Sequence, residues 1–186
     1  MNRYNRFSHI KNLCLIGLFL ALLAICSYVH LPIFSTAFTL QIFGIYLCLF
    51  VLGAKKGLIC IGVYILAGML GLPVFSGFMG GFGVILGKTG GFIIGFLPSA
   101  LLCSVLVRVF KKGALYEFLA AVISLLPCYI IGVLWFSYVY FGGISPEALI
   151  PSVTLSLLPF ILPDIIKLAA AVYLGNKFNS IINKGK

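Results

Sequence analysis

The chain has 186 residues, of which 62% are hydrophobic and only 9% are charged, and its mean hydropathy is +1.22. A soluble domain of this length has too little interior to bury so much apolar surface, so the composition excludes a soluble protein and indicates an integral membrane protein. The net charge of +10 does not indicate nucleic-acid binding, because the basic residues lie in short clusters between apolar runs, with no stripe interleaved with exposed aromatic residues.

Six apolar segments follow one another along the chain, and each is predicted to be a membrane helix. A spanning helix needs roughly 20 apolar residues, so the chain is long enough for six spans with short connections. The first segment resembles a signal peptide, but Ile25 is bulky where a cleavage site needs a small residue. We therefore predict one all-α transmembrane domain over residues 1–186, with helices at about 12–29, 39–54, 57–70, 89–107, 115–141 and 150–174.

The basic residues predict the orientation of these helices. Lysine and arginine accumulate on the cytoplasmic side of membrane proteins. With the N-terminus in the cytoplasm, all but two of the thirteen basic residues fall on that side, and the exceptions are Lys88 and Lys167. Both chain ends are therefore expected in the cytoplasm, and the connection between the third and fourth helices is expected outside.

That outer connection is rich in glycine. Residues 71–96 read GLPVFSGFMGGFGVILGKTGGFIIGF and contain nine glycines, no acid and one lysine. Glycine at this density permits close backbone approach and turns with positive φ. Non-helical backbone at membrane depth is tolerated only where it is buried in protein or lines a cavity. The segment is interpreted either as a re-entrant or lid-like loop over a small-molecule site, or as an ordinary flexible connection.

Gly87-Lys88-Thr89 within this segment invites comparison with a phosphate-binding loop. That motif requires a glycine five positions before Gly87, and Phe82 stands there. The segment is also predicted to lie outside the cell, away from ATP. Lys88 is therefore interpreted in two other ways: it attracts an anionic ligand to the outer mouth of a site, or it lies among lipid headgroups.

Two charged residues fall inside the sixth apolar segment, Asp164 and Lys167. Three positions apart on a helix, they share one face. Each charge costs roughly 2.5–3.5 kcal/mol at mid-membrane, so both are expected to pair, meet water or hold a ligand. A buried ion pair that fixes the helix is the alternative, but such pairs are weak stabilising devices, which favours ligand contact. Pro163 is predicted to start a half-helix here.

Motifs of enzymes and metal sites are missing from the sequence. There is no H-E-x-x-H or G-x-S-x-G motif, and the chain holds only three acids, of which Glu117 and Glu147 are expected to be solvated. The six cysteines lie within apolar segments without C-x-x-C spacing, which favours buried, reduced packing residues over a metal or redox site. We therefore predict no catalytic residue, no metal and no cofactor.

Gly17 and Ala21 in the first apolar segment form a small-xxx-small pattern. This pattern allows close packing of another membrane helix. The helix that packs there belongs either to this chain or to a partner.

Several of these motifs together resemble the BioY family, the biotin-specific substrate-binding (S) components of energy-coupling-factor (ECF) vitamin transporters. They are the block from Gly71-Leu72-Pro73-Val74-Phe75 through Gly80-Gly81 to Gly87-Lys88-Thr89-Gly90-Gly91-Phe92, then Ile94-Gly95-Phe96, with Thr39-Leu40-Gln41 and Pro163-Asp164 followed by Lys167. The resemblance extends from about residue 15 to residue 174. Two positions depart from it: Lys88 stands where many members have proline, and Phe92 where many have tyrosine.

The resemblance implies a six-helix S component in the plasma membrane of a prokaryote, whose outer half encloses biotin. Asp164 and Lys167 match the family's polar ligand contacts. The other substrate-binding residues that it suggests are Thr39, Gln41, Phe75, Lys88, Thr89, Gly91, Phe92 and Tyr138. Phe75, Phe92 and Tyr138 would cover the ligand rings.

The resemblance also implies partners. The first three helices, with Gly17 and Ala21, would dock on a transmembrane coupling (T) protein, which in turn joins two cytoplasmic ATPases. Transport would then involve toppling of the S component in the bilayer. Three alternatives remain: an S component for another vitamin, a stand-alone ion-coupled carrier, and an intramembrane enzyme.

Overall fold

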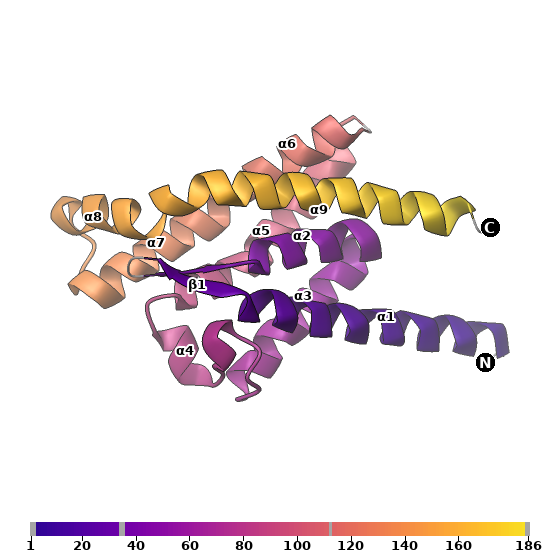
Figure 1. The fold of residues 1–186 in the computed structure, drawn as a ribbon, viewed down its shortest axis with the longest axis horizontal. Coiled ribbons are helices and arrows are strands. Elements are labelled where there is room, and N and C mark those ends of the chain that lie inside the picture. The colour runs from indigo at the N-terminus through magenta and orange to yellow at the C-terminus, as the bar shows by residue number, and fades with distance from the viewer. Residues whose placement is uncertain (1–2, 34–35, 112, 185–186) are drawn as a thin grey trace.

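The computed structural model describes residues 3–33, 36–111 and 113–184, and most of them are helical. The N-terminal end of α1 and the C-terminal end of α9 lie at the same end of the molecule, and α8 lies at the opposite end (Figure 1). The longer helices are α1 (Arg3–Tyr28), α2 (Gln41–Leu52), α3 (Ala54–Met69), α5 (Gly90–Val109), α6 (Ala114–Ser124), α7 (Leu126–Phe141), α8 (Pro146–Ser156) and α9 (Leu158–Lys184).

Four stretches of the described chain are long and apolar enough to cross a membrane. They are residues 10–28 of α1, the whole of α5, the continuous path 114–141 through α6 and α7, and residues 158–181 of α9. The 12 residues of α2 span about 18 Å at roughly 1.5 Å per residue, less than the roughly 30 Å of the hydrocarbon core. The fold is therefore that of a membrane protein, and the count of six spans stays a prediction.

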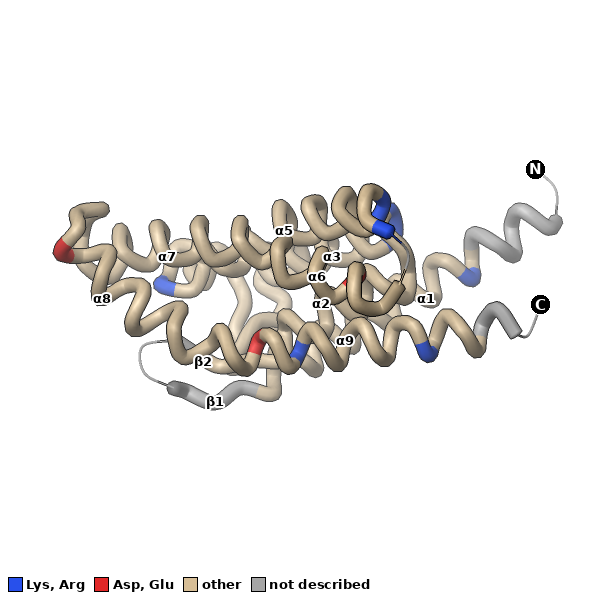
Figure 2. The backbone as a smooth tube through the Cα atoms, turned by 90° about the horizontal axis from the view of Figure 1, so that it is seen from above, with Lys and Arg blue, Asp and Glu red and all other residues tan. Residues whose placement is uncertain are grey.

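The charges have an uneven distribution along the molecule. Figure 2 shows most of the lysine and arginine positions at the end of the bundle where α1 begins and α9 ends. Asp164 and Lys167 lie instead in the first half of α9. The prediction that both chain ends are cytoplasmic agrees with this distribution, and it stays a prediction because the structure contains no membrane.

A small β-hairpin corrects the prediction of an all-α chain. Strands β1 (His30–Ile33) and β2 (Thr36–Thr39) pair antiparallel, with His30 opposite Thr39. A plain loop to Phe38 was expected from the sequence, followed by a helix that begins at Thr39. Pairing the two strands satisfies backbone N–H and C=O groups that would otherwise need other partners. Helix α2 therefore starts only at Gln41.

Proline and backbone breaks divide the last two predicted helices. Leu125 separates α6 from α7, and Pro127 lies in the first turn of α7. Proline is tolerated there because the N–H groups of a first turn form no hydrogen bond within the helix. The sixth predicted helix is two helices, because Leu157 (φ −120°, ψ −58°) breaks the path between α8 and α9. Pro163 lies inside α9 and does not start a half-helix, so that prediction is wrong.

The core lies between α2, α3, α5 and α9. Tyr46, Tyr64, Ile61 and Leu168 are among its fully buried side chains. Five of the six cysteines are buried and free, as predicted, and Cys14 is exposed. The cavity described below borders this core, because Phe75, Ile93 and Phe96 belong to both.

Two glycines bring α5 and α7 into close contact on one wall of that space. A Cβ atom at Gly91 would lie 2.3 Å from Cβ of Trp135 and 2.8 Å from the backbone oxygen of Ile131. A Cβ atom at Gly95 would lie 2.8 Å from Cα of Cys128. No side chain fits at these distances, so the two helices need glycine here.

We expect Gly91→Ala to lower stability by about 1–3 kcal/mol, because the added methyl group forces α5 away from α7. The change is measured as a lower melting temperature of the purified protein. Gly62→Ala is the matched control, since a Cβ atom at Gly62 has no neighbour within 4 Å and alanine favours a helix. Equal melting temperatures for the two variants would contradict the packing argument.

Candidate binding site

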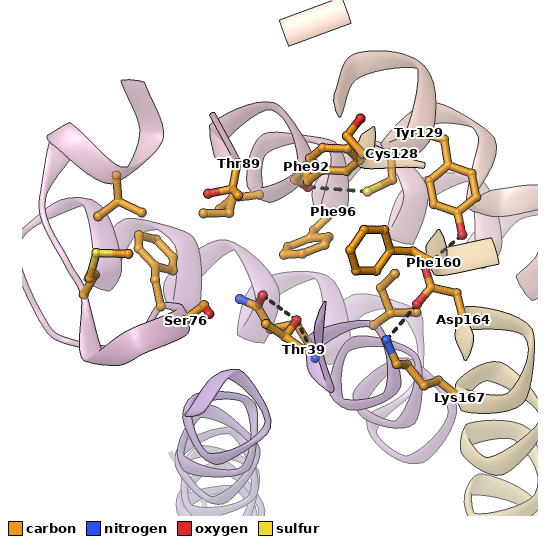
Figure 3. Close-up of a pocket in the computed structure, with 17 residues that line it drawn as sticks. Thr39, Ser76, Thr89, Phe92, Phe96, Cys128, Tyr129, Phe160, Asp164 and Lys167 are labelled. Atoms are coloured by element: carbon orange, nitrogen blue, oxygen red, sulfur yellow. Dashed lines mark hydrogen bonds and ion pairs between the residues drawn. The ribbon is translucent and has the colours of Figure 1, made fainter. Parts of the chain in front are cut away.

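A cavity opens between α2, α5, α7, α9 and the glycine-rich segment (Figure 3). The cavity has a volume of about 90 Å³ and opens at a mouth. Its lining residues are mostly apolar, with a few polar groups. They are Thr39, Gln41, Ile42, Phe75, Ser76, Met79, Val84, Thr89, Phe92, Ile93, Phe96, Cys128, Tyr129, Ser156, Phe160, Asp164 and Lys167.

A charged cluster stands at one end of the cavity. Lys167 Nζ donates to Asp164 Oδ1 at 2.8 Å, and the hydroxyl of Tyr129 donates to Asp164 Oδ2 at 2.8 Å. Only 2% of Asp164 and 6% of Lys167 are exposed. Lys167 Nζ also lies 3.9 Å from the centroid of the Phe38 ring, a cation–π contact. The prediction that Asp164 and Lys167 share a helix face is confirmed, and both line the cavity.

This cluster has hydrogen-bonding capacity left for a ligand. Each carboxylate oxygen offers about two lone-pair sites, and an ammonium group has three donors. In the described part of the chain each oxygen of Asp164 accepts one hydrogen bond, and Lys167 donates one. A ligand that carries both a donor and an acceptor can therefore bind here without breaking the pair.

A chain of hydrogen bonds connects the floor of the cavity to the glycine-rich segment. Thr39 Oγ1 donates to Gln41 Oε1 at 2.9 Å, and Gln41 Nε2 donates to the hydroxyl of Tyr64 at 2.8 Å. Tyr64 in turn donates to the backbone oxygen of Val74 at 2.8 Å. Gln41 and Thr39 are thus held in fixed positions along the cavity, by a network that continues from α2 through α3.

Residues 71–89, called the lid below, cover one side of the cavity. The lid contains a 3₁₀ turn (Ser76–Phe78) and the short helix α4 (Phe82–Leu86). Phe75, Ser76, Met79, Val84 and Thr89 of the lid line the cavity. The ring of Phe75 is buried over Gly68, where a Cβ atom would lie 2.1 Å from it. The lid is therefore a folded wall of the site, which favours the lid-like interpretation over a flexible connection.

Unpaired hydroxyl groups mark the end of the cavity opposite the charged cluster. Figure 3 shows Ser76 and Thr89 on one side and Asp164 with Lys167 on the other, with Phe92, Phe96 and Phe160 between them. In the described part of the chain, the hydroxyls of Ser76 and Thr89 form no hydrogen bond with a protein group. The cavity is thus an aromatic slot with a polar group at each end.

The comparisons with known proteins agree on one family. Residues 1–184 match the BioY family. The chain belongs to the BioY family. Over 167 residues it is 39% identical to the probable biotin transporter BioY of Pyrococcus horikoshii, covering 90% of this chain and 95% of that protein. The biotin transporter BioY of Thermotoga maritima is 30% identical over 165 residues, covering 89% and 94% of the two chains.

A solved structure shares the fold of this BioY-family chain. It is the crystal structure of the S-component for biotin from an ECF-type ABC transporter, with a TM-score of 0.82 and 23% sequence identity. The match covers 97% of this chain and 95% of that one. The likeness extends over the whole bundle and includes the elements that build the cavity.

Most site residues predicted from the BioY resemblance line the cavity, and three do not. Thr39, Gln41, Phe75, Thr89, Phe92, Asp164 and Lys167 line it. Gly91 packs against α7 instead, and Lys88 is exposed, with Nζ lying 4.5 Å from the centroid of the Tyr140 ring. Tyr138 is 61% exposed and lies outside the lining. Tyr138 follows Tyr129 by nine positions, which is about two and a half helical turns. It therefore lies on the opposite face of α7.

Tyr129, Phe96, Phe160 and Ser156 line the cavity without having been predicted from the sequence. Tyr129 is the most informative of them, because its hydroxyl binds Asp164 directly. A phenol inside an apolar segment needs a hydrogen-bond partner, and a buried acid is a natural one. That reasoning could have paired the two residues from the sequence.

Gly17 and Ala21 are exposed on α1 of this BioY-family chain. A Cβ atom at Gly17 would have no neighbour within 4 Å. The small-residue face is therefore not used for close packing within the described part of the chain. Contact of this face with a partner stays a prediction.

Proposed function

We propose that this chain is the biotin-binding S component of an ECF-type importer, which captures biotin outside the cell for ATP-driven uptake. The observation that carries the proposal is the aromatic slot with the Asp164–Lys167–Tyr129 cluster at one end. Family membership and the names of the relatives support it. The homologues are transporters, which fits a protein without catalytic activity.

The chemistry of biotin matches the slot. Biotin has a ureido group with N–H donors and a carbonyl acceptor, an apolar bicyclic ring and an acidic tail. Asp164 accepts from the ureido N–H groups, and Lys167 donates to the ureido oxygen. Phe75, Phe92 and Phe160 cover the rings. This combination of an apolar pocket with a few polar anchors is typical of small-molecule sites.

We place the ureido group at Asp164 and the carboxylate at Ser76 and Thr89. The reverse orientation would bring the ligand carboxylate beside the Asp164 carboxylate, and like charges repel at short range. Lys167 is already neutralised by Asp164, whereas the hydroxyls of Ser76 and Thr89 are free to donate. Thr89 is the N-cap residue of α5, whose N-terminal dipole favours an anion.

The proposed protein works as part of a complex in the plasma membrane of a prokaryote. We place six spans in the membrane, with both chain ends in the cytoplasm and the lid outside. The partners are a transmembrane coupling protein and two cytoplasmic ATPases, because this chain has no nucleotide-binding motif of its own. The exposed face of α1 at Gly17 and Ala21 is the proposed docking surface.

Binding of labelled biotin to the purified protein tests the ligand assignment. We expect saturable binding that unlabelled biotin displaces and that thiamine and riboflavin do not. Preferential binding of another vitamin would mean an S component for that vitamin. Uptake by the chain in vesicles without any ATPase would indicate a stand-alone carrier.

A further inference from the structure

The outer surface of the lid is strongly apolar. Leu72, Phe78, Met79, Phe82 and Leu86 are each more than half exposed. The whole stretch from residue 57 to residue 87 contains no Asp, Glu, Lys, Arg or His. An exposed apolar patch of this kind marks a surface that meets something other than water.

Part of the lid backbone is hydrogen-bonded within the protein. Phe75 N donates to Met79 O at 2.9 Å, and Gly81 N donates to Gly68 O at 2.7 Å. Leu72 N and Val74 N also donate to backbone oxygens. A loop in water needs none of these bonds, because water satisfies its polar groups, whereas a loop in hydrocarbon needs them all.

Side chains from three helices satisfy further carbonyl groups of the lid. From α1, Ser27 Oγ lies 2.6 Å from Val74 O, and the hydroxyl of Tyr28 binds Pro73 O. From α7, Trp135 Nε1 donates to Gly87 O at 3.0 Å. Tyr64 of α3 donates to Val74 O, as described above. Several carbonyl groups of the lid thus point into the protein, while Leu72, Phe78, Phe82 and Leu86 are exposed.

The position of the lid fits the same interpretation. In Figure 1, the turn between α7 and α8 lies farther from the ends of α1 and α9 than α4 does. Ser145 lies in that turn and the exposed Glu147 in the first turn of α8, and both are suited to water. Near the same end of α7 are Tyr138 and Tyr140, the residue type that membranes hold at their interface. The lid therefore lies closer to the hydrocarbon than the water-exposed turn between α7 and α8 does.

We propose that the lid lies in the outer leaflet of the membrane, with Leu72, Phe78, Phe82 and Leu86 against lipid acyl chains. Lys88, at the end of the lid, extends toward the headgroups beside Tyr140. Opening of the site then moves the lid through lipid, so the state of the outer leaflet affects how fast ligand enters. The proposal rests on the membrane assignment and not on the identity of the ligand.

Fluorescence quenching of an added tryptophan tests this placement. The chain has one tryptophan, Trp135, which gives the baseline emission. Phe82→Trp and Phe78→Trp are reconstituted in phosphatidylcholine vesicles, and the added emission is measured against the parent. Phosphatidylcholine brominated near the headgroup end of its acyl chains should reduce the added emission about twofold or more, as expected for side chains at the acyl boundary. Iodide in the outer solution should leave it nearly unchanged.

Two control variants calibrate the quenchers. Glu147→Trp should be quenched by iodide and not by brominated lipid. Leu101→Trp, on the exposed face of α5, should be quenched best by lipid brominated near the methyl end of the chain. A melting temperature equal to that of the parent shows that each variant is folded, independently of biotin binding.

Two results would overturn the proposal. Iodide quenching of Phe82→Trp as strong as that of Glu147→Trp would place the lid in water. Protection of both lid variants from both quenchers would mean that protein covers the lid, for instance a second copy of the chain. Biotin binding measured on the same samples keeps the ligand assignment separate from the placement of the lid.

Discussion

Replacing Asp164 and Lys167 together, by Leu and Met, is expected to leave a folded protein that no longer binds biotin. Exchanging a buried ion pair for apolar residues of similar size is often neutral or stabilising by about 1–4 kcal/mol. A pair that served only to fix α9 would therefore be dispensable for binding. A pair that holds the ureido group would not be, because its hydrogen bonds to the ligand are lost along with it.

The single variants complete this test. Asp164→Asn and Lys167→Ala should each weaken biotin binding by at least tenfold, about 1.4 kcal/mol. Lys167→Ala should also lower the melting temperature, since removing one partner of a buried pair costs about 3–5 kcal/mol. Affinity is measured by titration with labelled biotin and stability by thermal unfolding. If the double variant bound biotin with the affinity of the parent, the pair would be purely structural.

The helices were predictable because they are long apolar segments, and membrane spans need little more than length and hydropathy. The importance of Asp164 and Lys167 was predictable for a related reason: charges in hydrocarbon are costly, so the few that remain have a use. The lid was identified by its glycines. Each of these conclusions depends on composition, which the sequence displays directly.

The direction of individual side chains was not predictable in the same way. In a membrane helix, the face toward lipid and the face toward the core are both apolar, so periodicity does not distinguish them. Tyr138 was therefore placed in the site although it lies on the outer face of α7, while Tyr129, on the inner face, was missed. Gly91 was assigned to the ligand because it stands in the family motif, and its actual neighbour is Trp135.

The hairpin was missed for a different reason. Its strands have only four residues each, which is too short for an alternation of apolar and polar residues to be recognised. In addition, Pro32 lies in the first strand, and proline is a signal against a strand. Cys26 O of α1 accepts from Leu40 N at 3.1 Å, so tertiary contact holds the residue that leads into α2. Local sequence alone does not contain that information.

Gly17→Leu should abolish most biotin uptake while leaving biotin binding unchanged. A Cβ atom at Gly17 would have no neighbour within 4 Å, so a larger side chain there displaces no described residue. Leucine at this position therefore fits the isolated protein. It does not fit beneath a partner helix that packs on Gly17 and Ala21, because close helix approach in membranes depends on small residues.

The measurement compares two quantities for each variant. Uptake is followed in vesicles that contain the coupling protein and both ATPases, and affinity is titrated on the purified S component. Uptake by Gly17→Leu and Ala21→Leu should fall at least tenfold, a loss of about 1.4 kcal/mol in the docking equilibrium. Ala170→Leu, on the exposed surface of α9, is the matched control and should transport normally. Normal uptake by both α1 variants would mean that the docking surface lies on another helix. If biotin affinity fell together with uptake, α1 would instead support the binding site, through the contact of Ser27 with Val74.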